Sequence, residues 1–278
     1  MTKVIAALVQ LRTPATQAAA LEQAEPLVRQ AARDGARLIA TPEATNILQR
    51  DRSKLFELVR PLEEDVCVQG LVGLARELKV WLLIGSALVR REDGQLANRS
   101  VLVSDAGEVK ATYDKIHMFD VDLPTGERHR ESAVYTPGER ASVAATPWGP
   151  VGMTVCYDVR FPHLYRSLAK AGAKIVTVPA AFTRPTGEAH WEVLLRARAI
   201  ETAAFVLAPA QGGFHEDGRG TWGRSTIVGP WGQVLAKAED DEPGVVSAEL
   251  DLEEVDKARV AIPALANDRD FAAPELRP

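Results

Sequence analysis

Three ionisable side chains in this sequence come directly after segments that read as strands. Glu43 follows RLIATP, Lys115 follows KATYD and Cys156 follows GMTV. A cysteine thiolate is a nucleophile, a fixed ammonium stabilises a developing oxyanion, and a carboxylate relays protons as general base and acid. Because catalytic groups in layered α/β proteins gather at the carboxyl ends of strands, this set predicts covalent catalysis by Cys156.

The residues that follow Cys156 support its prediction as the nucleophile. The segment CYDVRFP begins a helix near Pro162. We expect the amino-terminal amides and dipole of that helix to favour the thiolate, and the backbone N–H of Tyr157 to donate a hydrogen bond to an oxyanion. The alternative is that Cys156 is a small inert residue packed at the end of a strand, as free cysteines commonly are.

Lys115 and Glu43 also have structural alternatives when each is considered alone. A buried ammonium needs a partner, but a surface Lys115 would simply pair with Asp114. Pro42 holds the backbone extended before Glu43, which then serves either as the general base or as a turn or N-cap acid. The combination of the three residues at three strand ends is what favours catalysis.

Strand and helix patterns alternate along the whole chain. The expected helices span residues 16–36, 51–79 with a break near Pro61, 162–173, 188–203 and 252–260. The expected strands span residues 4–11, 37–43, 80–90, 96–105, 108–115, 174–182, 204–211, 223–230, 233–239 and 244–250, with a hairpin over 141–158.

These elements predict an α/β fold. Strands that are apolar throughout, such as KIVTV and AFVLA, are typical of strands buried on both faces, and amphipathic helices should cover the outside of mixed sheets. The chain has no repeat, low-complexity tract or linker-like stretch, so we expect a single domain over residues 1–278. The glycine-rich segment 213–223 lacks the lysine and hydroxyl residue of a phosphate-binding loop and is expected to be a flexible loop.

Composition excludes several classes of protein. The 278 residues are 46% hydrophobic and carry a net charge of −5, with no basic stripe for nucleic acid or an anionic membrane surface and no apolar run long enough to span a bilayer. The free thiols Cys67 and Cys156 fit a reducing cytoplasm, and Cys67 reads as inert helix packing. No CxxC or HExxH motif occurs and the five histidines lack ligand spacing, so neither a metal nor a cofactor is expected.

Taken together, the motifs identify a resemblance to the nitrilase superfamily of carbon–nitrogen hydrolases that covers nearly the whole chain. The matching segments are Pro42-Glu43, Lys115, ESAVYTPG (131–138), CYDVRFP (156–162), 189–202 and GPWG (229–232). The resemblance implies a four-layer αββα sandwich that usually dimerises into an eight-layered assembly. It also implies a Glu-Lys-Cys triad at Glu43, Lys115 and Cys156, with Glu131 orienting Lys115 or the substrate nitrogen.

The implied reaction is hydrolysis of an amide through a thioester. Glu43 takes the thiol proton as sulfur attacks, Lys115 and the Tyr157 N–H hold the oxyanion, and Glu43 then protonates the leaving amine and activates water. A cation beside a carboxylate lowers its pKa, so burial or Glu131 is expected to keep Glu43 in a useful range. A Cys–His pair with His117 or His190 would leave Glu43 and Lys115 without a role.

The second half of the chain is similar to the Nit branch, which contains deaminated-glutathione amidase and ω-amidase. Residues 190–202 and 208–232 resemble the former in particular, so this resemblance implies deaminated glutathione as the substrate. A substrate of this kind is a small amide with carboxylate groups, and arginine binds carboxylates bidentately. We expect Arg160 to bind one, with Phe182 and Thr186 lining the pocket; Arg184 is the alternative for a distal carboxylate, and an ion pair with Asp158 or Glu43 is the alternative for Arg160.

Three other functions remain open at this point. The first is an ω-amidase acting on α-ketoglutaramate or α-ketosuccinamate, and the second is a nitrilase that uses the same residues on a nitrile. The third is a catalytically idle scaffold or binding protein of the same fold. An intact Glu-Lys-Cys set argues against the scaffold.

Overall fold

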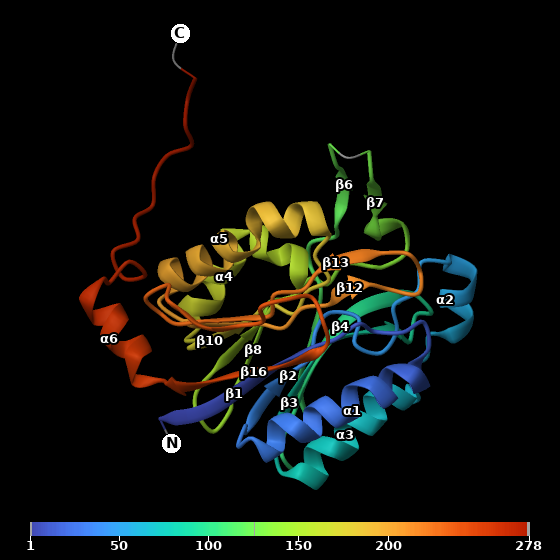
Figure 1. The fold of residues 1–278 in the computed structure, drawn as a ribbon. Coiled ribbons are helices and arrows are strands. Elements are labelled where there is room, and N and C mark those ends of the chain that lie inside the picture. The colour runs from blue at the N-terminus through green and yellow to red at the C-terminus, as the bar shows by residue number, and fades with distance from the viewer. Residues whose placement is uncertain (1, 125, 277–278) are drawn as a thin grey trace.

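Two six-stranded mixed sheets face each other in the computed structural model, which describes residues 2–124 and 126–276 (Figure 1). The first sheet has the spatial order β16 (Gly244–Asp251), β1 (Lys3–Gln10), β2 (Leu38–Ala40), β3 (Trp81–Arg90), β4 (Leu96–Val103) and β5 (Val109–Asp114). The second has the order β15 (Val234–Lys237), β14 (Thr226–Val228), β11 (Phe205–Ala208), β10 (Ile175–Thr177), β9 (Val151–Met153) and β8 (Ser142–Ala144).

Helices cover the outer faces of the two sheets (Figure 1). They are α1 (Gln17–Arg33) and α3 (Val66–Leu78) on the first sheet, and α4 (Pro162–Lys170) and α5 (Arg184–Thr202) on the second. The remaining elements are α2 (Arg52–Leu58), α6 (Glu253–Ala261), the hairpins β6 (Asp120–Asp122) with β7 (Arg128–Arg130) and β12 (Gly212–Phe214) with β13 (Gly220–Trp222), and the 3₁₀ turns η1 (Glu131–Ala133) and η2 (Cys156–Arg160).

Alternation of side chains along β1 explains the layering. Ala6 and Leu8 belong to a buried cluster that also contains residues of the second sheet, whereas Ala7 and Val9 pack with the buried residues of α1 and α3. Successive side chains of a strand point to opposite faces, so an entirely apolar strand supplies two cores at once. The four-layer αββα sandwich expected from the resemblance is therefore the observed fold.

Parallel strands in the middle of each sheet set the position of the candidate site. Strands β1, β2 and β3 run parallel to one another, as do β9, β10 and β11. Glu43 lies just beyond the carboxyl end of β2, Cys156 lies just beyond that of β9, and Lys115 follows β5 directly. The packing of one sheet on the other brings these ends to one place.

The structure differs from the expected elements in several places, among them the strands expected over 37–43 and 174–182, which end at Ala40 and Thr177. Segment 213–223 is not a flexible loop but lies largely in the β12–β13 hairpin, which turns at Gly218 with a φ of +79° and is anchored by buried His215, whose Nε2 lies 2.7 Å from Thr221 Oγ1. Helix α5 begins at Arg184 rather than at Glu188, because Pro185 fits the first turn of a helix. Within the described ranges, no helix has the length and apolarity to cross a membrane.

Candidate active site

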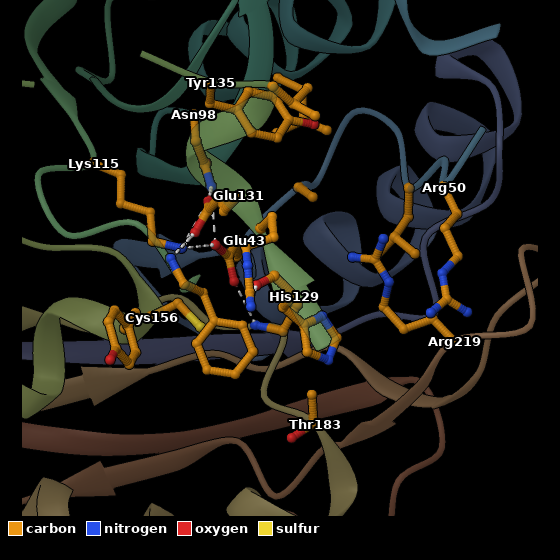
Figure 2. Close-up of a pocket in the computed structure, with 18 of the residues that line it drawn as sticks. Glu43, Arg50, Asn98, Lys115, His129, Glu131, Tyr135, Cys156, Thr183 and Arg219 are labelled. Atoms are coloured by element: carbon orange, nitrogen blue, oxygen red, sulfur yellow. Dashed lines mark hydrogen bonds and ion pairs between the residues drawn. The ribbon is translucent and has the colours of Figure 1, made fainter. Parts of the chain in front are cut away.

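A buried network joins Lys115 to two glutamates beside Cys156 (Figure 2). The Lys115 ammonium donates to Glu43 Oε1 at 2.9 Å and to the Glu131 oxygens Oε1 and Oε2 at 2.9 and 2.8 Å. Its side chain is only 2% exposed. The two carboxylates offset the cost of burying this cation, so the expectation of a partnered, buried lysine holds and pairing with Asp114 does not. Asp114 instead binds Arg99.

Cys156 occupies a strained backbone position at the start of η2. Its φ is +50°, in the left-handed region that residues with a side chain rarely adopt, and its N–H donates to the Pro179 carbonyl at 2.8 Å. Tyr157, the next residue, lines the same cavity as Cys156. A sharp turn of this kind after β9 presents the Cys156 sulfur to the cavity. The backbone of Cys156 stays hydrogen-bonded to Pro179, which follows β10 of the second sheet.

The protonation states follow from burial and from the charges around the thiol. Burial, followed by the charge of Glu43, raises the pKa of the Cys156 thiol well above its ordinary value. Burial also acts to raise the pKa of Glu43, but the charge of Lys115 and hydrogen bonds from Cys156 and Lys115 outweigh it and leave that pKa lowered. Burial opposes the charge on Lys115, yet the charges of Glu131 and Glu43 raise its pKa.

The resting site therefore holds a neutral thiol, an ionised Glu43 and an ionised Lys115. Any contribution of the following helix, α4, to the thiolate is outweighed, because burial and the adjacent carboxylate leave the pKa of the Cys156 thiol raised. The thiol proton instead faces the carboxylate that would receive it, which is the arrangement needed for general-base activation of a nucleophile.

Asn98, which sequence reasoning missed, connects the two glutamates. Its Nδ2 donates to Glu43 Oε1 at 2.9 Å and lies 3.3 Å from Glu131 Oε1. The backbone N–H groups of Ala181 and Phe119 hold the other oxygens of Glu43 and Glu131, at 2.8 and 2.6 Å. The one available signal for Asn98 was a polar amide in the otherwise apolar strand LANRSVLV.

The substrate-binding residues expected from the sequence separate into two groups. Phe182 and Thr186 line the cavity of about 250 Å³ that contains Cys156. Among the described residues Arg160 is not part of the lining: its guanidinium lies 5.4 Å from the centre of the Phe182 ring, and its Nη1 is 3.3 Å from His190 Nδ1. Aromatic faces hold this cation through cation–π contacts, which explains why it pairs with neither Asp158 nor Glu43.

Arg184 also lies outside the cavity. Its Nη1 binds Asp241 and its guanidinium stacks on Phe214. The arginines that do line the cavity come from segments to which the sequence analysis assigned no binding role: Arg50, Arg52, Arg128, Arg130 and Arg219. Their positions depend on how α2 and the two hairpins fold over the strand ends, which no local pattern shows.

The two histidines offered for a Cys–His pair have other partners. His117 Nδ1 lies 2.7 Å from Asp158 Oδ1, and the His117 ring stacks on Phe161 at 3.6 Å between centres. His190 contacts Arg160. No group of three or more histidine, cysteine, aspartate or glutamate side chains suited to a metal ion occurs in residues 2–124 and 126–276.

Comparison with known proteins agrees with this geometry. The model of the carbon–nitrogen hydrolase family matches residues 5–260. Deaminated glutathione amidase of Yersinia enterocolitica is 41% identical over 256 residues, covering 90% of this chain and 87% of that protein. The structure of Saccharomyces cerevisiae Nit3, a member of branch 10 of the nitrilase superfamily, superposes with a TM-score of 0.84 at 28% identity and covers 94% of this chain and 95% of that one.

A third relative carries a trapped group on its cysteine. It is a mutant of the amidase from Nesterenkonia sp. AN1 with the acetamide moiety of fluoroacetamide added covalently at the active-site cysteine. Its TM-score is 0.78 at 27% identity, with 96% of this chain and 94% of that chain covered. The chain therefore belongs to the carbon–nitrogen hydrolase family and is a hydrolase that acts on amide C–N bonds.

Proposed function

We propose that this protein hydrolyses the γ-amide bond of deaminated glutathione through a thioester on Cys156. The observation that carries the proposal is the contact of Lys115 with both Glu43 and Glu131 next to the thiol. The names of relatives at about 40% identity supply the substrate. This substrate is glutathione with an oxo group in place of its amino group, so one carboxylate lies on each side of the scissile bond.

In the proposed acylation, sulfur bonds to the amide carbon as the thiol proton passes to Glu43. Lys115 and the Tyr157 N–H stabilise the oxyanion that forms. When the tetrahedral intermediate collapses, the C–N bond breaks and Glu43 gives its proton to the leaving amine, cysteinylglycine. The acyl group that remains on Cys156 is that of α-ketoglutarate.

Deacylation reverses the same proton path with water in place of sulfur. Glu43 removes a proton from the water that attacks the thioester carbon, and the C–S bond then breaks. The proton returns to the leaving thiolate, whose raised pKa makes it a ready acceptor. Glu131 and Asn98 keep Lys115 and Glu43 in place through both steps, which is the role we assign to Glu131.

The surrounding cavity residues complete the proposal. Phe182 and Thr186 line the pocket, and we assign them to the acyl group of the substrate. Because Arg160 is held on the ring of Phe182, we propose that it acts on the substrate carboxylate only by leaving that stacked position. The substrate that we propose is therefore a small anionic amide.

We further propose that the chain is one domain that forms a homodimer in the cytoplasm. Val193 and Ile200 lie seven residues apart on α5, on one face of the helix, and their exposed fractions are 69% and 56%. Trp231 is 60% exposed, and its neighbour Gly232 lies beside Ile200. Large apolar side chains gathered on an outer layer are typical of an interface between subunits.

The test combines turnover and trapping. Wild-type protein should release α-ketoglutarate and cysteinylglycine from deaminated glutathione, and brief incubation followed by acid quenching should leave an acyl group on the peptide that contains Cys156, detected by mass spectrometry. Cys156→Ala should show neither product nor adduct, and Glu43→Gln should lose on the order of 10²–10⁴-fold in turnover. A wild-type protein inert toward this substrate would refute the proposal.

A further inference from the structure

The lining of the catalytic cavity carries an excess of positive charge. Five arginines and Lys115 line it, against the two carboxylates of Glu43 and Glu131. Both of those carboxylates already bind Lys115. The whole chain has a net charge of −5, so this cationic lining is local to the cavity. A concave site lined by one sign of charge concentrates ligands of the opposite sign.

The five arginines differ in how far their charges are neutralised. Arg130 makes a bidentate contact with Asp122 at 2.9 and 2.8 Å, and Arg128 Nε lies 3.4 Å from the same carboxylate. Arg219 has only one longer contact, 3.4 Å from its Nη2 to Asp217. Arg50 and Arg52 have no carboxylate within 4.0 Å in the part of the chain that the structure describes. Arg50, Arg52 and Arg219 therefore retain the most capacity to bind an anion, and Arg50 and Arg219 are the two whose charges act on His129 in the same cavity.

Arg50 and Arg219 come from different elements but lie in one region of the cavity. Figure 2 shows both on the side away from Lys115 and Cys156, with His129 between the two groups. Burial lowers the pKa of His129, and the charges of Arg219 and Arg50 lower it further, which agrees with both guanidinium groups facing the middle of the cavity.

We infer that Arg50 and Arg219 form a subsite that binds a carboxylate on the leaving group of the substrate. The inference rests on the proposed function and assigns the residues that distinguish deaminated glutathione from α-ketoglutaramate. Deaminated glutathione and α-ketoglutaramate deliver the same acyl group to Cys156, so the protein distinguishes them only through contacts with what departs: cysteinylglycine in one case and ammonia in the other. A pair of guanidinium groups is suited to a carboxylate.

The length of the leaving group sets how far from the scissile bond the subsite must lie. Two residues of extended chain span about 7 Å, so the glycine carboxylate of cysteinylglycine lies roughly that far beyond the scissile nitrogen. The cavity of about 250 Å³ extends from Cys156 to Arg50 and Arg219. The subsite therefore selects peptide-like amides with a free carboxyl terminus, and it draws them in by charge.

The experiment compares two substrates that differ only at the proposed contact. They are deaminated glutathione and the same molecule with its glycine carboxylate converted to a carboxamide. For wild type we expect kcat/KM to be at least tenfold higher for the free acid. Arg219→Gln and Arg50→Gln should each reduce that ratio by about tenfold, mainly through KM, which corresponds to about 1.4 kcal/mol.

Arg184→Gln is the matched control, because Arg184 is a nearby arginine that pairs with Asp241 outside the cavity. Its ratio should equal that of wild type. The ratio is insensitive to partial misfolding, since both substrates are measured on one preparation. A wild-type ratio near one, or ratios unchanged in both arginine variants, would overturn the subsite while leaving the proposed function intact. Wild-type protein inert on both substrates would overturn both proposals.

Discussion

At the scale of single residues, the central feature is where the proton sits before reaction. The nucleophile is a buried thiol whose pKa is raised, and the adjacent Glu43 is ionised because its pKa is lowered. A thiolate formed before substrate binds would place a negative charge beside Glu43 in a buried site. Moving the proton as sulfur attacks avoids that state, so activity should depend strictly on an ionised Glu43.

The first prediction concerns pH. Glu43 becomes protonated only as the pH falls through its lowered pKa. The value of kcat/KM should therefore stay level across the neutral pH range and fall only below about pH 4.3, the ordinary pKa of glutamate. The raised pKa values of Lys115 and Cys156 place any alkaline decline above about 8.5, the ordinary value for cysteine. Steady-state rates at constant ionic strength, with circular dichroism to exclude unfolding, provide the measurement. A half-maximal point near pH 6.5 would show that a histidine is the base.

The second prediction concerns Asn98 as a positioning residue. Asn98→Ala removes a hydrogen bond to the ionised Glu43, worth about 1.5–3 kcal/mol, so kcat should fall on the order of 10–100-fold. Loss of that donor should also raise the pKa of Glu43 and move the acid limb of the pH profile upward. A loss of activity with an unmoved acid limb would indicate only a structural defect.

Asn46→Ala is the matched control for Asn98→Ala. Asn46 is an equally buried amide that binds Asp65 and the Leu88 backbone and does not line the cavity. Its removal should reduce the free energy of unfolding by about 1–3 kcal/mol through unsatisfied partners. The acid limb of its pH profile should coincide with that of wild type.

At the scale of elements, a buried carboxylate joins the chain segments at the ends of β5 and β9. Asp158, two residues after the nucleophile, accepts hydrogen bonds from Tyr113 Oη at 2.7 Å, the Val155 N–H at 2.8 Å and the His117 N–H at 3.1 Å. Tyr113 belongs to β5, which Lys115 follows directly, and Val155 follows β9. Asp158 thus fixes the segment of Lys115 relative to that of Cys156.

The third prediction concerns the strand end that carries Glu43. A Cβ at Gly85 of β3 would lie 1.8 Å from the Thr41 carbonyl oxygen and 2.6 Å from that of Pro42. Gly85→Ala must therefore displace the backbone next to Glu43, and we expect a loss of about 1–3 kcal/mol in the free energy of unfolding and at least tenfold in kcat/KM. Urea denaturation and steady-state kinetics measure the two effects.

Gly73→Ala is the control for Gly85→Ala. Gly73 lies within α3, and a Cβ there meets no atom within 4 Å. Because alanine is favoured over glycine inside a helix, this variant should gain up to about 1 kcal/mol in stability and keep wild-type activity. If the two variants behaved alike, close backbone approach at Gly85 would not be what positions Glu43.

At the scale of the whole molecule, the two outer helical layers differ in what they expose. The α5 face presents Val193 and Ile200, and the turn beside it presents Trp231. Helix α5 lies on the outer side of the second sheet, on the opposite side of the molecule from α1 and α3 (Figure 1). This face is therefore the one that we assign to the homodimer.

The fourth prediction tests that interface. Wild-type protein should sediment as a dimer at micromolar concentration, and the double variant Val193→Asp, Ile200→Asp should raise the dimer dissociation constant at least about a hundredfold, because it buries two uncompensated charges. Val66→Asp on α3 is the control, since Val66 is 52% exposed on the other outer layer and should leave the dimer intact. A monomeric wild type would contradict the assignment.

The parts of this protein that local sequence patterns determine are its elements and its strand-end residues. Periodicity of apolar side chains predicts the strands and helices, and a strand that is apolar on both faces must lie between two layers. Glu43, Lys115 and Cys156 were identifiable because each ionisable group directly follows a segment that reads as a strand. The family resemblance connects the same three positions.

Other features depend on contacts between residues far apart in the chain, and only the tertiary structure decided them. Asn98 contacts Glu43 across 55 positions, and the thiol pKa depends on burial between two sheets. Arg160 and Arg219 are chemically equivalent in the sequence, yet aromatic rings hold the first outside the cavity lining and a hairpin places the second inside it. Side-chain direction, burial and the field of neighbouring charges exist only once the layers have packed.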